Sequence, residues 1–256
     1  MPAPQVVRYR DEYKHVISCH SKVILEKRLA AVLKMDEHST TDGYLVRSVY
    51  FDTPHDHALW DKIDGVPHQE KFRIRCYNND YGFLRLEKKV KDFNRGYKLG
   101  APITREAVEA IIRGDLGCLQ LSTARERLHN EFLIKCRTTL LRSKVVVEYR
   151  RKVFVFGPAR TRVTLDYDMR SSAVAEDFFC PDMPHGTLEE DRCVLEVKFD
   201  GFLPEIVRDL VQVAETTSSA NSKYVNARIA SSPLTPRLRG TVDAWLDRNT
   251  EIARGD

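Results

Sequence analysis

Residue types alternate with a period of two along several short segments of the chain. Residues 70–77 have the sequence Glu-Lys-Phe-Arg-Ile-Arg-Cys-Tyr, and residues 84–90 have Leu-Arg-Leu-Glu-Lys-Lys-Val. Turn-forming residues at 78–82 separate them, so the pattern predicts a β-hairpin with one apolar and one charged face. Like charges that face each other on a sheet destabilise it. Such a face is therefore either solvated or compensated by a bound polyanion.

The same alternation recurs along much of the chain. It predicts further strands at 6–17, 44–51, 97–99, 144–151, 153–156, 162–168 and 193–199. Helices are expected at 21–34, with Ser21 as N-cap, and at 52–60, 104–112, 123–141, 204–216 and 241–248. About eight such strands fit an open sheet with its charges in water, or a closed antiparallel barrel with its charges inside. Helices with apolar stripes need a sheet face to cover, which favours the barrel.

Composition narrows the class of protein only slightly. The chain has 256 residues, of which 42% are hydrophobic and 30% are charged, and its net charge of +4 does not call for nucleic acid as a partner. The six cysteines show no CxxC spacing and are expected to be reduced thiols in a cytoplasmic protein. No run is long and apolar enough for a membrane span, so a membrane association would come from a partner protein not encoded in this chain.

Six short motifs occur in order along the chain. They are Tyr13–Ile17, Ser48–Pro54, Lys71–Arg75, Leu86–Lys89, Val194–Lys198 and Ser222–Tyr224. Together they resemble the VTC-type polyphosphate polymerase domain, a branch of the triphosphate tunnel metalloenzymes. The resemblance implies an α+β fold with a closed eight-stranded antiparallel β-barrel and flanking helices. We also expect a single domain over 1–256, with its core at about 8–228, the part that carries the resemblance, and a C-terminal helix at about 241–250.

The resemblance also implies roles for individual residues. The phosphate-binding residues would be Lys14, Arg73, Arg75, Lys89, Lys98, Tyr149, Arg151, Arg162, Lys198 and Lys223. Arg73, Arg75, Lys89, Arg151 and Glu196 would act in catalysis. Glu196 would bind Mn²⁺ or Mg²⁺, with Glu87 and then Glu148 as further carboxylates, because hard cations prefer oxygen ligands. No glycine-rich phosphate loop is present, so side chains would hold the nucleotide.

These roles predict a metal-dependent polymerase that transfers the γ-phosphate of ATP to inorganic polyphosphate or pyrophosphate. A related branch of the superfamily carries Glu-x-Glu-x-Lys on its first strand, whereas residues 10–14 here are Arg-Asp-Glu-Tyr-Lys, which favours the polymerase branch. Two alternatives stay open: a triphosphatase or polyphosphatase with water as acceptor, and a non-catalytic polyphosphate- or nucleotide-binding module. Nucleic acid is not an expected partner, because the cations are expected to point inward.

Overall fold

A large antiparallel sheet organises the fold. The computed structural model describes residues 10–93, 95–117, 127–184, 186–188, 191–213, 217–218, 222–231 and 240, so the helix predicted at 241–250 lies outside the described residues. The strands are β1 (Asp11–Ser18), β2 (Lys34–Met35), β3 (Tyr44–Asp52), β4 (His68–Tyr77), β5 (Asp80–Asp92), β6 (Arg95–Ile103), β7 (Arg142–Phe156), β8 (Thr161–Ser172), β9 (Gly186–Thr187), β10 (Arg192–Phe199) and β11 (Thr217–Ser218). The helices are α1 (Cys19–Val32), α2 (His57–Ile63), α3 (Arg105–Arg113), α4 (Arg127–Thr138), α5 (Glu205–Leu210) and α6 (Lys223–Ser231), with two 3-10 turns, η1 (Pro158–Arg160) and η2 (Ala175–Phe179).

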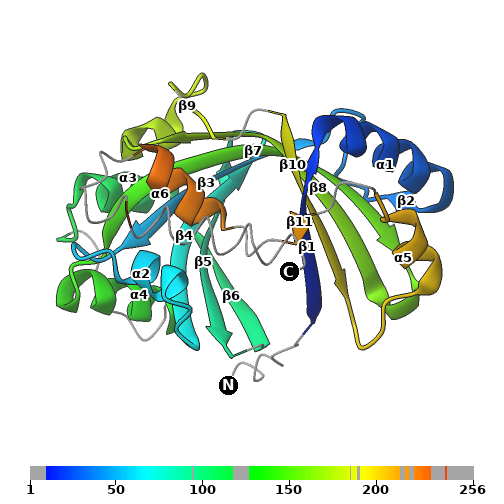
Figure 1. Cartoon of the computed structure of the whole chain (residues 1–256). Helices are drawn as coiled ribbons and strands as arrows, with labels where there is room; N and C mark the ends of the chain where they lie inside the picture. Colours follow the sequence, from blue (N-terminus) through cyan, green and yellow to red (C-terminus); the bar gives the residue numbers. More distant parts are fainter. Residues whose placement is uncertain are drawn as a thin grey trace.

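The sheet is strongly curved but is not closed, so the predicted closed eight-stranded barrel is wrong. Nine strands follow the order β11-β1-β10-β8-β7-β3-β4-β5-β6, while β2 pairs with β7 and β9 with β8. One edge of β1 pairs with β10 and the other with β11, through His15 and Val16, so this part of β1 cannot pair with β6. Figure 1 shows β1 and β6 on opposite sides of the resulting opening. A longer-range ion pair spans it, with Lys89 Nζ of β5 3.9 Å from Glu12 of β1.

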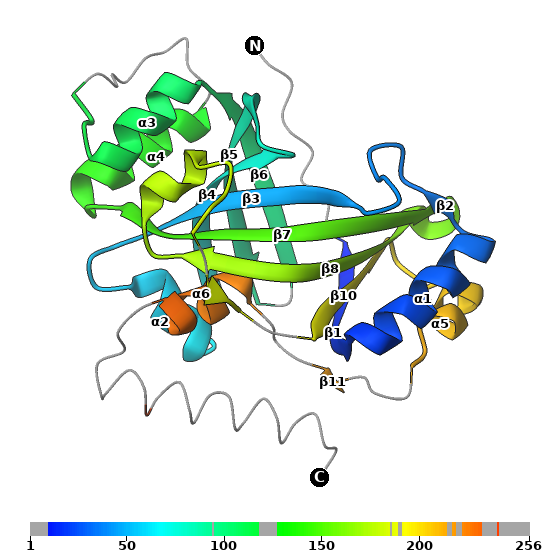
Figure 2. The same cartoon turned by 90° about the horizontal axis from the view of Figure 1, so that it is seen from above.

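The convex face carries most of the helices and two apolar clusters. Helices α1 and α5 cover β1, β10 and β8, where Leu25 and Leu29 pack with Leu165 and Leu195. Helices α3 and α4 cover β4, β5 and β6, where Phe132 meets Phe51 and Phe72. Figure 2 shows these two helix pairs at the two ends of the sheet. As predicted, the apolar residues of these strands lie on the face that the helices cover.

The concave face is partly filled by α2 and α6. Tyr224 and Val225 of α6 pack with Val145, Val147 and Tyr149 of β7 in a third apolar cluster. Asp52 fixes both helices. Its carboxylate accepts hydrogen bonds from the backbone N–H groups of Thr53, Ala58 and Leu59 and, at 2.6 Å, from the Tyr224 hydroxyl. The remainder of the concave face carries the charged side chains.

Residues with capping or turn preferences determine where α1 begins and where β4 turns into β5. Ser18, rather than the predicted Ser21, caps α1, and its Oγ accepts from the Ser21 N–H at 3.1 Å. The β4–β5 turn is tighter than predicted, because Asn78 and Asn79 both adopt positive φ angles of 50° and 55°. Asparagine tolerates this region, and two such residues suit the twist of a short hairpin. The hairpin register is thereby set, with Arg73 opposite Glu87 and Lys71 opposite Lys89.

Candidate active site

Alternating residues of the strands from β1 to β6 in the sheet order direct charged or hydroxyl-bearing side chains to the concave face. Phe72, Ile74 and Cys76 are buried under the outer helices, so Lys71, Arg73 and Arg75 between them face inward. The register places Lys14 opposite Glu196, and Arg151 opposite Asp166. Three clusters of opposite charges result.

The first cluster is centred on Glu87 of β5. Arg73 Nε and Nη2 both lie 2.7 Å from Glu87 Oε2, and Lys98 Nζ lies 2.7 Å from Oε1. Burial alone would raise the pKa of Glu87, which is 1% exposed, but Arg73, Arg75 and Lys98 lower it far below its usual value. Glu87 is therefore ionised and fully engaged by cations. Arg73 Nη1 also donates to the Tyr50 hydroxyl at 3.3 Å.

The second cluster is centred on Asp166 of β8. Arg151 binds it in a bidentate manner, at 2.6 and 2.7 Å, and Lys223 Nζ lies 2.7 Å away. Asp166 is 0% exposed, and burial would raise its pKa, yet Arg151 and Lys223 lower it to about 2. Lys223 lies 4.8 Å from the centre of the Tyr149 ring. Because a guanidinium carries five N–H donors, Arg151 can hold Asp166 and still present donors to phosphate.

Tyr149 connects this second cluster to β4. Its hydroxyl accepts a hydrogen bond of 3.1 Å from Arg75 Nη2, while Arg75 Nε donates to Ser48 Oγ at 3.0 Å. Arg75 is 4% exposed, and no carboxylate pairs with it among the described residues. Two neutral hydroxyls hold this buried guanidinium, which leaves its charge uncompensated at short range.

The third cluster contains two carboxylates, Glu196 of β10 and Glu12 of β1. Lys198 forms an ion pair with Glu196, and Lys14 forms one with Glu12 while lying 4.0 Å from Glu196. Burial would raise the pKa of Glu196, but Lys14, Lys198 and Arg151 hold it well below its usual value. Lys89 approaches Glu12 at 3.9 Å and is 50% exposed.

The donor set of this third cluster fits a hard divalent cation. Glu196 and Glu12 are ionised oxygen donors on adjacent strands. The negative charges of both carboxylates raise the pKa of Lys14. In the described residues no group of three or more histidine, cysteine, aspartate or glutamate side chains comes together. One or two carboxylates suffice when phosphate oxygens and water complete the coordination. Glu12 lies beside Glu196 in this cluster, whereas Glu87, the further carboxylate predicted from the sequence, lies in the first cluster with Arg73 and Lys98.

Two predicted residues lie apart from the three clusters. Arg162 is 38% exposed, and its Nη2 lies 3.8 Å from Asp36 at the margin of the concave face. Glu148 points to the convex face, where Arg47 Nε donates to it at 2.7 Å. Arg47 also donates to three backbone carbonyls of the segment 178–181, so this buried pair anchors that segment to the sheet. Glu148 is therefore not available to a metal on the concave face.

Several concave-face residues were not among the predicted site residues. Asp166, Glu12 and Tyr50 all face the predicted cations, and alternation within their strands was the available signal. Lys71 lies on the same strand face as Arg73 and Arg75, a pattern visible in the sequence. Lys62 reaches the same face from α2, which strand periodicity could not indicate.

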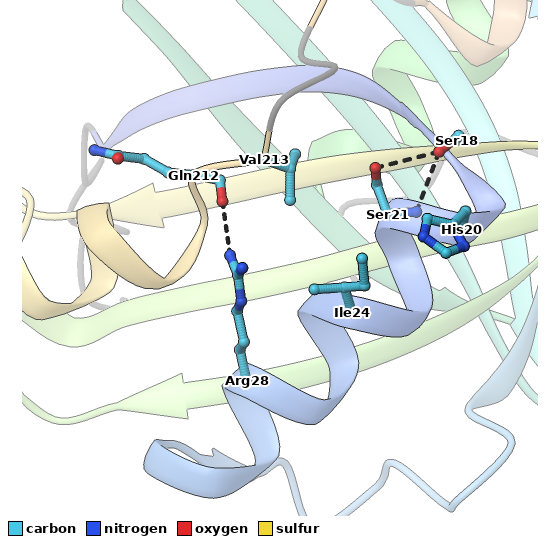
Figure 3. A pocket seen from close by; sticks show the side chains of 7 residues that line it. All are labelled: Ser18, His20, Ser21, Ile24, Arg28, Gln212 and Val213. Atoms are coloured by element: carbon cyan, nitrogen blue, oxygen red, sulfur yellow. Dashed lines mark hydrogen bonds between the residues drawn. The ribbon is translucent and has the colours of Figure 1, made fainter.

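A second hollow lies outside the concave face. It has a volume of about 840 Å³ and is lined by Ser18, His20, Ser21, Ile24, Arg28, Gln212 and Val213. Figure 3 shows Arg28 reaching from α1 to the backbone oxygen of Gln212, at 2.9 Å. This lining contains one arginine, already hydrogen-bonded, and no carboxylate. The chemistry of this lining suits a triphosphate and a divalent metal far less well than that of the concave face does.

Comparison with known families gives one extensive match. A family model described as the VTC domain matches residues 9–231. No curated protein matches the chain. Among solved structures, the PH1012 protein of Pyrococcus horikoshii is 15% identical, with 88% of this chain and 92% of that chain covered and a TM-score of 0.41. A chain of the Schizosaccharomyces pombe Mediator head module is 9% identical, with 79% and 89% covered and a TM-score of 0.44.

The Mimivirus capping enzyme triphosphatase is 9% identical to this chain. The similarity covers 80% of this chain and 89% of that chain, with a TM-score of 0.35. Similarities this remote do not carry a function from one protein to another.

Proposed function

The chain belongs to the VTC domain family, and from this premise we propose that it is a metal-dependent polyphosphate polymerase. It would transfer the γ-phosphate of ATP to a growing chain of inorganic polyphosphate. The proposal covers one domain and a cytoplasmic setting, with no nucleic acid as partner. All five cysteines in the described residues are free thiols. In the described residues no helix is long and apolar enough to cross a membrane.

The observation that carries the proposal is the excess of buried positive charge on one face. Arg73 donates to the Tyr50 hydroxyl and Arg75 to the Tyr149 hydroxyl. Arg151 and Lys223 lie over the Tyr149 ring, so the four cations lie close together. Glu87 holds Arg73 and Asp166 holds Arg151 in fixed orientations, which preorganises the remaining N–H donors of these two arginines. Phosphoryl transfer needs placement and charge neutralisation far more than covalent chemistry, and these residues supply both.

The roles divide by position. We assign the binding of the nucleotide phosphates to Arg73, Arg75 and Arg151, with Lys223 adding a further positive charge from the start of α6. Lys89, near the opening and half-exposed, would neutralise charge on the phosphate being transferred. Glu196 and Glu12 would hold Mn²⁺ or Mg²⁺. When bound, the cation would neutralise phosphate oxygens and orient them for in-line attack.

A hydrolase of the same fold is the second candidate, and the open sheet favours it. Lys89 and Lys98 beside the opening are 50% and 51% exposed, so water can reach this end of the concave face. Water would then replace the phosphate chain as acceptor. The same cations would serve either reaction, because they bind the donor.

The test is incubation of the purified chain with ATP and Mn²⁺, followed by a gel stained for polyphosphate and an assay of free phosphate. A ladder of long chains supports the polymerase, and free phosphate without chains supports the hydrolase. Glu196→Gln should abolish metal-dependent turnover. Glu205→Gln is the matched control, since Glu205 lies on α5 at the convex face and is 79% exposed. Unchanged turnover in Glu196→Gln would remove its assigned role.

A further inference from the structure

Helix α6 brings Lys223 to the concave face, and two other side chains of the helix hold it there. Lys223 is the first residue of α6, and its Nζ lies 2.7 Å from Asp166. Tyr224 and Arg228 follow four residues apart, so they lie on the same side of the helix. Both are buried, and in the part of the chain that the structure describes neither pairs with a carboxylate of the three charged clusters. These two side chains therefore hold α6 through contacts outside those clusters.

Tyr224 and Arg228 both bind aspartates at the start of α2, the helix beside α6 (Figure 2). Arg228 binds Asp56 in a bidentate manner, with Nη1 2.8 Å from Oδ1 and Nη2 3.0 Å from Oδ2. Arg228 Nη1 also donates to the Tyr224 hydroxyl at 3.0 Å, and this hydroxyl donates to Asp52 at 2.6 Å. Four side chains therefore join the two helices through a continuous set of hydrogen bonds.

The Asp56 carboxylate serves this contact and does not cap its own helix. The φ of 57° and ψ of 40° of Asp56 lie in the left-handed region, which aspartate and asparagine tolerate better than most residues. Its carboxylate makes no hydrogen bond to the backbone of α2, where Asp52 accepts from the N–H groups instead. The Asp56 carboxylate binds Arg228 and also Lys144 of β7, whose Nζ lies 2.9 Å away. Burial would raise the pKa of Asp56, but Arg228 and Lys144 lower it, so the carboxylate is ionised.

The link between α2 and α6 lies close to Lys223 along the helix. Lys223 and Arg228 are five residues apart in α6, which is about 7.5 Å along the helix axis. Because so short a helix moves as one body, a rotation of α6 at Arg228 also displaces Lys223. We infer that Asp56 and Arg228 are positioning residues, which hold α6 so that Lys223 stays in the phosphate-binding site. Lys223 is one of the residues assigned above to the nucleotide phosphates, so this role rests on the proposed function.

The test is a double-mutant cycle on the binding of tripolyphosphate to the full chain, without ATP or metal. It compares the wild-type chain, Asp56→Asn, Lys223→Gln and the variant with both changes. Asparagine keeps the shape of Asp56 and tolerates its backbone conformation, so the substitution removes the charge alone. Lys223→Gln should weaken binding about tenfold, because it removes a charged partner of phosphate. Asp56→Asn should weaken binding about fivefold in the wild-type chain and have no further effect beside Lys223→Gln, since the residue through which it acts is gone.

The direction of the change separates positioning from simple electrostatics. Asp56→Asn makes the chain more positive, which by itself would strengthen the binding of an anion. Weaker binding therefore indicates that Lys223 is displaced. Arg228→Gln should also weaken binding, and Arg228→Lys less so, because lysine keeps a charge for Asp56. Both differences should vanish beside Lys223→Gln, and these variants test the same contact if Asp56→Asn does not fold.

Glu205→Gln is the matched control, because it removes an exposed ion pair with Arg208 on α5 and should leave binding unchanged in both backgrounds. Circular dichroism of each variant checks that it is folded. Equal losses for Asp56→Asn with and without Lys223→Gln would show a role in general stability and overturn the positioning role, while the proposed function stands. Unchanged or tighter binding in Asp56→Asn, or no loss in Lys223→Gln, would overturn it as well. Failure of the wild-type chain to bind tripolyphosphate would overturn both.

Discussion

Asp166 is the residue whose neutralisation tests most sharply how the concave face is stabilised. Its carboxylate is completely buried and holds two cations, Arg151 through two hydrogen bonds and Lys223 through a third contact. In Asp166→Asn the side chain keeps its shape and loses its charge. Both cations then remain in a buried site with only the more distant Glu196 to compensate them.

The structure sets the size of the effect. Arg151 and Lys223 lower the pKa of Asp166 from its ordinary value of 3.8 to about 2, which corresponds to about 2 kcal/mol of stabilisation. The orphaned cations add a further penalty, and removal of one member of a buried ion pair typically costs about 3–5 kcal/mol in total. We therefore expect the free energy of unfolding to fall by about 3–5 kcal/mol.

The assay is urea denaturation followed by circular dichroism, with and without tripolyphosphate. The control is Asp168→Asn on the same strand, where the carboxylate is 38% exposed, pairs with Arg170 at 3.1 Å, and should cost no more than about 1 kcal/mol. Asp168 has a φ of 52°, a conformation that asparagine also tolerates. Tripolyphosphate should restore part of the stability of Asp166→Asn, since it binds the folded state and supplies negative charge. A loss below about 1 kcal/mol in Asp166→Asn would refute the reasoning.

Three further outcomes follow from the same structure. Glu148→Gln leaves Arg47 buried without a counter-charge and should lower the free energy of unfolding by about 3–5 kcal/mol. The control is Glu109→Gln on α3, where the ion pair with Arg105 is more exposed and the change should be less than about 1 kcal/mol. Similar values for the two variants in urea titrations would contradict this. Tyr224→Phe removes the 2.6 Å hydrogen bond to Asp52 and should cost about 1.5–3 kcal/mol, against no measurable change for the exposed Tyr13→Phe. Lys71 has a lower pKa in the folded chain than in the unfolded chain, so above about pH 7 the unfolded state binds more protons. The ligand-free wild type should therefore gain stability relative to Lys71→Gln as the pH rises from about 7 towards 10. A constant difference between the two across that range would show that Lys71 is not perturbed.

The sequence predicted the strands well wherever one face is apolar and the other charged. The 70–77 and 84–90 segments form β4 and β5 with the expected faces, because alternation is imposed by burial of Phe72 and Ile74 under α4. It did not predict that the sheet stays open, nor that the two-residue strand β11 pairs with His15 and Val16 on the second edge of β1. Such a short pairing leaves no periodic signal.

The candidate site was predictable to a similar degree. The cations at alternate positions of the strands were enough to predict a charged inner face. Their carboxylate partners could not be recognised in the sequence, because an aspartate on a strand, such as Asp166, is usually solvated. The helix α6 was missed, because residues 223–231 mix helix formers with Tyr, Val, Asn and Ile. Its position is set by packing on Val145 and Tyr149 and by the hydrogen bond to Asp52, which are tertiary contacts. Lys223 was assigned through family resemblance, without the helix that carries it.

The central claim is that a triphosphate and a divalent cation bind to the concave face of the sheet. Its most direct test is a crystal structure with a non-hydrolysable ATP analogue and Mn²⁺, with anomalous scattering to locate the metal. We predict phosphate density in contact with Arg73, Arg75 and Arg151, and an anomalous peak beside Glu196. Phosphate bound only in the hollow beside Arg28, with Mn²⁺ remote from Glu196, would contradict the assignment.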